Sequence, residues 1–103
     1  MKRKVYIAGK ITGDPNYREK FQWAGNHFRE CGDIVLNPAS LPEGMSRADY
    51  MRICFAMMES ADIVAVLPNY QDSLGARVEI AWCDYIKKPY FVMPNVFGGE
   101  RHD

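Results

Sequence analysis

Glu79 is the residue whose position in this sequence most strongly suggests chemistry. The stretch from Leu74 to Lys88 has helical spacing, and because each residue of a helix turns about 100°, Glu79 lies roughly opposite Arg77. The residues that share its side of the helix are apolar: Trp82, Cys83 and Ile86. A carboxylate on an apolar face is costly unless it is paired, binds a ligand or takes part in a reaction. The pattern therefore predicts either a catalytic or binding carboxylate or a structural ion pair.

Two turns that contain glycine stand next to expected helices. Residues 9–13, GKITG, follow an apolar run and precede a helix, and Ser73-Leu74-Gly75 opens the helix that carries Glu79. Glycine lets the backbone approach a ligand, and the first turn of a helix has unpaired N–H groups, so such a place can bind phosphate. GKITG matches neither the Walker loop nor the GxGxxG pattern. Phosphate binding and an ordinary turn are both compatible with it.

Four short apolar runs alternate with three stretches of helical spacing. The apolar runs predict strands at residues 5–8, 33–36, 63–67 and 90–93. Gly32 is expected to end the first helix. A capping residue precedes each expected helix: Asp14 followed by Pro15, Ser46, and Asp72 or Ser73.

The order of these elements is βαβαβαβ, and the strands are apolar throughout instead of alternating, which is typical of a parallel sheet covered on both faces. We therefore expect a three-layer α/β fold, Rossmann- or flavodoxin-like, with four to five parallel strands in the order 2-1-3-4 and right-handed crossovers. Ligands of such folds bind beyond the carboxyl ends of the strands. Several of the polar and glycine-containing segments fall at that edge: residues 9–13, 37–38, 69–70 and 73–79.

The composition limits the class of protein. The chain has 103 residues, 48% of them hydrophobic, which predicts one domain over residues 1–103 with a small core. The formal net charge of zero argues against duplex nucleic acid as a partner, and no stretch is long and apolar enough for a signal peptide or a membrane span. The three cysteines have no CxxC spacing, so we expect reduced core thiols in a cytoplasmic protein, with no metal site and no cofactor: Cys31, Cys54 and Cys83.

Two motifs, taken together, resemble the nucleoside 2-deoxyribosyltransferase superfamily. In YIAGKITG, residues 6–13, four positions match a strand tyrosine followed by a Gly-x-Ile-x-Gly turn: Tyr6, Gly9, Ile11 and Gly13. In SLGARVE, residues 73–79, three positions match a Ser-x-Gly-x-x-x-Glu segment that opens a later helix: Ser73, Gly75 and Glu79. The spacing is most similar to that of the 2′-deoxynucleoside 5′-phosphate N-hydrolases. The resemblance extends from Lys4 to Met93, and the whole chain resembles the small phage and prophage members.

This resemblance implies a role for each matched residue. Glu79 would attack the anomeric carbon of a deoxyriboside and form a glycosyl ester, which water or a second base then cleaves. Tyr6 would hold that carboxylate by a hydrogen bond, although a tyrosine packed in the core fits its strand position too. The remaining matched residues would bind a 5′-phosphate: Gly9, Ile11, Gly13, Ser73 and Gly75. Ser73 also fits a plain helix cap, and Tyr70 is either a base-stacking residue or a surface residue of a turn.

The sequence departs from the superfamily at the position of an acid. Those enzymes have an Asp on the helix before the third strand, which contacts the sugar and helps to protonate the leaving base, and counting back from Asp62 places Cys54 there. A thiol cannot replace a carboxylic acid in these tasks. Asp49 and Asp62 are candidate substitutes, although Asp62 also fits an ordinary strand start. The hydrolases take a further residue from a neighbouring subunit, for which residues 95–103 offer no match.

Two functions follow from these features. The first is an N-glycosidase or deoxyribosyltransferase that acts on a 2′-deoxynucleoside or its 5′-monophosphate, with Glu79 as nucleophile. The alternative, suggested by Cys54, is a non-catalytic module that binds nucleotides or mediates a phage–host interaction; a fold that binds only protein ranks last. Neither a membrane nor duplex nucleic acid is expected as a partner. A small sheet leaves edges and helix faces uncovered, so we expect a homo-oligomer, a dimer or larger, with three candidate interface aromatics: Trp23, Tyr50 and Phe97.

Overall fold

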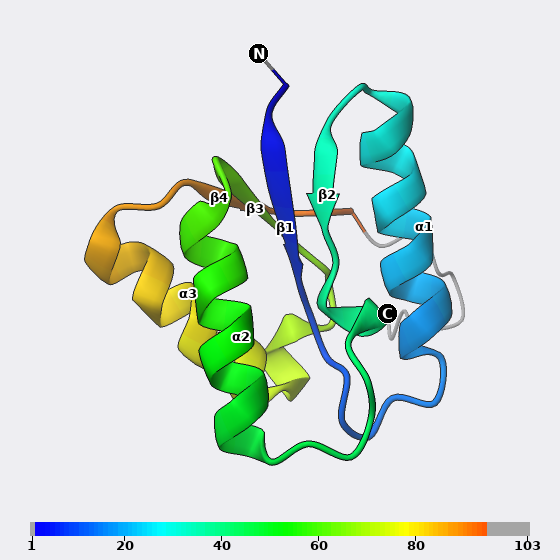
Figure 1. Ribbon diagram of the computed structural model, residues 1–103, viewed down its shortest axis with the longest axis vertical. Helices are drawn as coiled ribbons and strands as arrows, with labels where there is room; N and C mark the ends of the chain where they lie inside the picture. Colours follow the sequence, from blue (N-terminus) through cyan, green and yellow to red (C-terminus); the bar gives the residue numbers. More distant parts are fainter. Residues whose placement is uncertain (1, 95–103) are drawn as a thin grey trace.

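Four parallel strands form the centre of the molecule, in the order β2-β1-β3-β4 (Figure 1). The computed structural model describes residues 2–94, and the tail from Asn95 with its expected interface residue Phe97 lies outside them. The strands are β1 Lys4–Ala8, β2 Ile34–Leu36, β3 Ile63–Val66 and β4 Tyr90–Val92. The helices between them are α1 Tyr17–Glu30, α2 Arg47–Ser60 and α3 Leu74–Ile86, with short 3-10 helices η1 Pro38–Ser40 and η2 Tyr70–Asp72. The expected α/β class, parallel pairing and strand order are confirmed.

The helices cover both faces of the sheet, so the fold has three layers. Side chains alternate along β1: Val5 and Ile7 pack with residues of α1, whereas Tyr6 and Ala8 pack with residues of α2 and α3. Figure 1 shows the same division, with α1 on one side of the strands and α2 and α3 on the other. Because β1 is central and buried from Val5 to Ala8, the direction of the Tyr6 side chain is fixed by the pleat of the sheet.

Serine caps begin α2 and α3 as expected. The Oγ atom of Ser46 accepts a hydrogen bond from the N–H of Asp49, and that of Ser73 accepts one from the N–H of Ala76, each at 3.1 Å. Each bond satisfies one of the N–H groups that the first turn of a helix leaves unpaired. The start of α3, from which Glu79 projects, is therefore fixed by its own sequence.

The expected start of α1 is wrong. The helix begins at Tyr17, and its N-cap residue Asn16 makes no side-chain cap bond. Asp14, the expected cap, accepts a hydrogen bond from the N–H of Asn16 at 2.9 Å and pairs with Lys20, so its carboxylate is engaged in a turn and an ion pair. The expected end is confirmed, since Gly32 follows α1 with a φ of +90°.

The cysteines divide into two groups. Cys54 and Cys83 are buried, as expected, but Cys31 is exposed, because α1 ends at Glu30 before the apolar stripe can carry Cys31 into the core. Within residues 2–94, no helix has both the length and the apolar content that a bilayer span requires.

Candidate functional site

Glu79 and Tyr6 meet between α3 and the sheet. Tyr6 is 1% exposed and Glu79 is 6% exposed. The Tyr6 hydroxyl donates a hydrogen bond to Oε2 of Glu79 at 2.5 Å. Within the described part of the chain, no basic side chain forms an ion pair with Glu79. Glu79 therefore points into the protein, and Tyr6 is both a core residue and the hydrogen-bond donor to this carboxylate.

The burial of this pair changes the acidity of both groups. Burial raises the pKa of Glu79 from 4.5 to about 7, and the hydrogen bond from Tyr6 counteracts this only in part. Burial and the charge of Glu79 raise the pKa of Tyr6 well above its ordinary value, so the phenol keeps its proton and stays a donor. Near neutral pH, Glu79 is present in both its ionised and its protonated form. Carboxyl groups with such a pKa are frequent among catalytic acids, bases and nucleophiles.

Cys54 of α2 is the third member of the cluster. Its side chain is buried and forms a hydrogen-bond contact with Tyr6; burial, and to a smaller extent the charge of Glu79, raises the pKa of the thiol. Next to it, the sulfur atom of Cys83 lies 3.5 Å from that of Met58, and burial raises the pKa of Cys83 to about 11. Glu79 thus accepts a hydrogen bond from a phenol and lies near two thiols, and none of these three groups carries a positive charge.

The first turn of α3 lies one helical turn before Glu79. Ser73 acts here as a helix cap, which is one of the two roles expected for it. A Cβ atom on Gly75 would meet Oγ of Ser73 at 3.9 Å and Sδ of Met51 at 4.0 Å, which are ordinary contacts. Packing therefore does not require glycine at position 75. Its effect is to leave the backbone of this first turn uncovered, on the same side of α3 as Glu79.

The turn after β1 has structural reasons for its glycines. A Cβ atom on Gly9 would lie 2.8 Å from Cδ1 of Leu67, so only glycine allows the end of β1 to pack against this leucine. Gly13 has a φ of +84°, which favours glycine. Ile11 is partly buried and packs against the core beside α1. Folding alone explains these three residues, and phosphate binding by them stays a prediction.

Asp14, Lys20 and Asn69 form a polar cluster that the sequence analysis missed. Nζ of Lys20 lies 2.9 Å from Oδ2 of Asp14, with only 7% and 8% of the two side chains exposed, and Nδ2 of Asn69 donates to the same oxygen at 3.1 Å. This cluster joins the loop after β1 to the loop after β3. The two segments expected to bind a ligand, residues 9–13 and 73–79, therefore lie at one edge of the sheet. The sequence feature that indicates this cluster is Lys20, a charged residue next to Phe21 in the apolar stripe of α1.

The two acids considered as substitutes for Cys54 are engaged elsewhere. Oδ2 of Asp62 accepts a hydrogen bond from the N–H of Lys4 at 2.8 Å, so Asp62 is a strand-start residue at the amino ends of β1 and β3. Oδ1 of Asp49 lies 2.5 Å from Nη2 of Arg52 on the surface of α2. Tyr70, the candidate for base stacking, is half-buried and packs against the core beneath α2 and α3.

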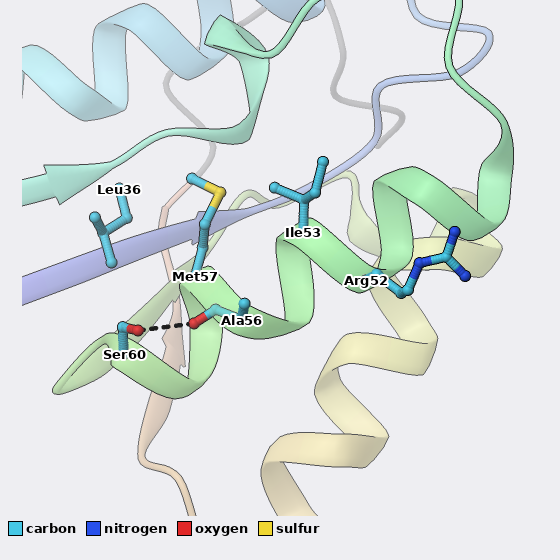
Figure 2. A pocket seen from close by; sticks show the side chains of 6 residues that line it. All are labelled: Leu36, Arg52, Ile53, Ala56, Met57 and Ser60. Carbon is cyan, nitrogen blue, oxygen red and sulfur yellow. Dashed lines mark hydrogen bonds between the residues drawn. The ribbon is translucent and has the colours of Figure 1, made fainter.

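An open groove of about 410 Å³ lies on another part of the surface (Figure 2). One residue of β2 and five of α2 line it: Leu36, Arg52, Ile53, Ala56, Met57 and Ser60. Figure 2 shows Met57 projecting from α2 beside Leu36, with Ile53 and then Arg52 farther along the helix. None of the expected site residues lines this groove, which is mainly apolar and lacks a buried acid. We therefore place the candidate site at Glu79.

Comparison with protein families assigns the chain to one of them. The family model described as "Domain of unknown function (DUF4406)" matches residues 3–91, and the chain belongs to this family. No curated protein matches the sequence. The matched span includes Tyr6, Cys54 and Glu79. The description of the family states no activity, so the resemblance to the nucleoside 2-deoxyribosyltransferase superfamily stays a prediction.

Proposed function

We propose that this member of the DUF4406 family is an N-glycosidase or deoxyribosyltransferase that cleaves the N-glycosidic bond of a 2′-deoxynucleoside or its 5′-monophosphate. The observation that carries the proposal is the buried Glu79 carboxylate, which Tyr6 holds at 2.5 Å and with which no basic side chain of the described residues forms an ion pair. Burying such a group costs stability, and a fold keeps it where the carboxylate has another task. The task that suits an electron-rich, poorly hydrated oxygen is attack on an electrophilic carbon.

The reaction takes place in two displacements. An Oε atom of ionised Glu79 forms a bond to the anomeric carbon while the bond to the base breaks, and the base leaves with that electron pair and takes up a proton. Water, or the nitrogen of a second base, then attacks the same carbon, loses a proton to solvent and releases the carboxylate. Tyr6 orients Glu79 in both steps. Because a thiol of raised pKa is a poor proton donor, the proton for the leaving base comes from solvent, and we expect slow turnover.

The pKa of Glu79 predicts how the rate depends on pH. Only the ionised carboxylate is a nucleophile, and the pKa of this group is about 7. Base release should therefore increase between pH 6 and pH 8, following the ionisation of one group, and level off above that range. A glutamate with an ordinary pKa of 4.5 would give a constant rate over the same range.

Release of free base tests the proposal. Purified protein is incubated with a panel of deoxynucleosides and their 5′-monophosphates, and the free base is measured by chromatography. We expect release by the native protein and a loss of at least ~10³-fold in Glu79→Ala and Glu79→Gln, because the nucleophile is removed. The matched control is Glu59→Gln, which changes an exposed glutamate of α2. Equal release by native protein and Glu79→Gln, or no release from any compound, would refute the proposal.

Cys54 favours one alternative, a nucleotide-binding module without catalysis. The cluster has a thiol where the resembling enzymes have an acid, and the other nearby acids are engaged elsewhere. For this alternative, calorimetry should detect binding of deoxynucleoside monophosphates by both the native protein and Glu79→Gln. No free base should appear after prolonged incubation. Consumption of substrate by the native protein excludes it.

A further inference from the structure

The outer face of α3 exposes apolar residues at intervals of four, three and four. Leu74 is 67% exposed, Val78 is 40% exposed and Tyr85 is 79% exposed, and Ala81 between them is exposed as well. On a helix, this spacing places the four residues in one straight stripe, which we call the α3 stripe. It faces away from the side of α3 that packs on the sheet. A stripe with this spacing is the usual seam between two packed helices.

We propose that a second copy of this chain covers the α3 stripe, with the two α3 helices antiparallel about a two-fold axis. The stripe is complementary to itself in this arrangement. Leu74 lies opposite Tyr85 of the second copy, and Val78 lies opposite Ala81 of the second copy. The smaller residues are then at the centre, where two packed helices approach most closely, and the larger ones fill the space at the ends. The two-fold axis produces each of these contacts twice.

The charges beside the stripe favour the same arrangement. Arg77 and Asp84 are both exposed and lie seven residues apart on one flank of the stripe. In an antiparallel pair, equivalent flanks face each other, so Arg77 of one copy meets Asp84 of the other, and the reverse pair forms at the opposite end. In a parallel pair the equivalent flanks lie on opposite sides of the interface, so Arg77 and Asp84 would not meet. Asp84 also accepts a hydrogen bond from Tyr90, which holds its carboxylate on this flank.

The size of the surface indicates how tight the dimer is. With 13 residues, α3 is about 20 Å long, which is short for a standard interface of roughly 800 Å² per partner. Stacked aromatic rings widen the stripe toward α2, with centroids 5.7 Å apart for Phe55 and Trp82 and 5.6 Å apart for Trp82 and Tyr85. We therefore expect a reversible dimer with a dissociation constant in about the micromolar range.

Two of the three interface aromatics expected from the sequence, Trp23 and Tyr50, have contacts within the chain. Trp23 stacks on His27 with ring centroids 6.2 Å apart, and the Tyr50 hydroxyl donates to the carbonyl oxygen of Pro42 at 2.5 Å. The α3 stripe thus has the clearer features of an interface. The inference does not depend on the proposed function, because a dimer forms through this stripe whether or not Glu79 is a nucleophile.

Sedimentation of the native protein and two matched variants tests the proposal. Val78→Glu places two carboxylates at the centre of the interface, and we expect the dissociation constant of the dimer to rise roughly 30-fold or more. Ile53→Glu is the control, because Ile53 is exposed to a similar extent, 36%, but lies on α2. It should leave the dimer intact. A native protein that is monomeric at every concentration, or a Val78→Glu dimer as tight as the native one, would overturn the proposal.

A charge exchange tests the direction of the helices. Arg77→Asp and Asp84→Arg should each weaken the dimer about tenfold, and the double variant should restore it, because the exchanged charges meet again across the two-fold axis. A double variant that dissociates as readily as the single variants would rule out the antiparallel arrangement. Circular dichroism checks that each variant is folded. If Val78→Glu unfolds, the charge exchange still tests the dimer, because Arg77 and Asp84 are both exposed and their substitution should not unfold the protein.

Discussion

Asp14 and Glu79 both have carboxylates with little exposed surface, and their partners differ. Asp14 pairs with Lys20 at 2.9 Å and accepts two further hydrogen bonds, from Asn16 and Asn69. Burial raises the pKa of Asp14, but the bonds and the charge of Lys20 outweigh it and hold that pKa below its ordinary value. Glu79 accepts a hydrogen bond from Tyr6, no basic side chain within residues 2–94 forms an ion pair with it, and burial raises its pKa to about 7.

This difference shows that burial alone does not mark a functional acid. A buried carboxylate with a cation and two further donors is ionised at neutral pH and joins parts of the structure. A buried carboxylate with only neutral neighbours is held at a cost to stability, and its charge is available for a ligand or a reaction. We therefore interpret Asp14 as a structural acid and Glu79 as a functional one, and the two should respond to substitution in opposite ways.

The largest effect on stability is expected at Asp14. Asp14→Ala removes the buried acceptor of the ion pair with Lys20 and of the hydrogen bonds from Asn16 and Asn69, which should lower the free energy of unfolding by about 3 to 5 kcal/mol. Urea denaturation at pH 7 measures this. The control is Glu43→Ala, which breaks the exposed pair between Arg18 and Glu43 and should cost less than about 1 kcal/mol. If the two variants lose the same free energy of unfolding, the assignment of Asp14 as a structural acid is wrong.

Substitution of Glu79 should raise the free energy of unfolding above neutral pH, whereas substitution of Asp14 lowers it. A carboxyl whose pKa is 4.5 in the unfolded chain and about 7 in the folded protein favours folding only while it is protonated. The native protein should therefore lose about 2 to 3 kcal/mol as the pH rises from 4.5 through 7, because the unfolded chain releases the proton first. Glu79→Gln should abolish this loss and be the more stable protein at pH 8. Urea denaturation of both proteins at several pH values measures this loss of stability. A Glu79→Gln variant that is less stable than the native protein at pH 8 would contradict the prediction.

A carboxylic acid at position 54 should increase the rate. Cys54→Asp places a proton donor beside Tyr6 and Glu79, and general acid catalysis of base departure is worth about 10²-fold or more. Cys54→Ser is the matched control, because a hydroxyl is also a poor acid and should give no gain. Rates of base release from one deoxynucleotide compare the three proteins. The interpretation of Cys54 as the cause of slow turnover fails if Asp and Ser at this position give the same rate.

The smallest effect is expected at Tyr6. Tyr6→Phe removes the hydrogen bond that lowers the pKa of Glu79, so that pKa should rise further above 7. Base release at pH 7 should fall about tenfold and recover in part at higher pH, where Glu79 ionises again. The pH–rate profile separates this shift from a structural defect, which would lower the rate equally at every pH.

Some parts of the fold and site were predictable from the sequence, and others were not. The parallel pairing of the strands follows from their continuous apolar runs, and the inward direction of Glu79 follows from helical spacing, so both depend on residues close together in the sequence. The start of α1 was predicted wrongly, because Asp14 before Pro15 has the local signature of a cap while its carboxylate binds Lys20. Asn69 reaches that carboxylate from 55 residues away, beyond any local pattern. Cys31 fits the stripe of α1 but lies past the end of the helix.

A covalent bond between Glu79 and the sugar can be detected by mass spectrometry. The protein is mixed with a deoxynucleotide, quenched in acid during turnover and digested. We predict that the peptide with Glu79 gains the mass of one deoxyribosyl phosphate, and that this adduct is missing in Glu79→Gln. Base release with an unmodified Glu79 peptide, or an adduct on another residue, would contradict it.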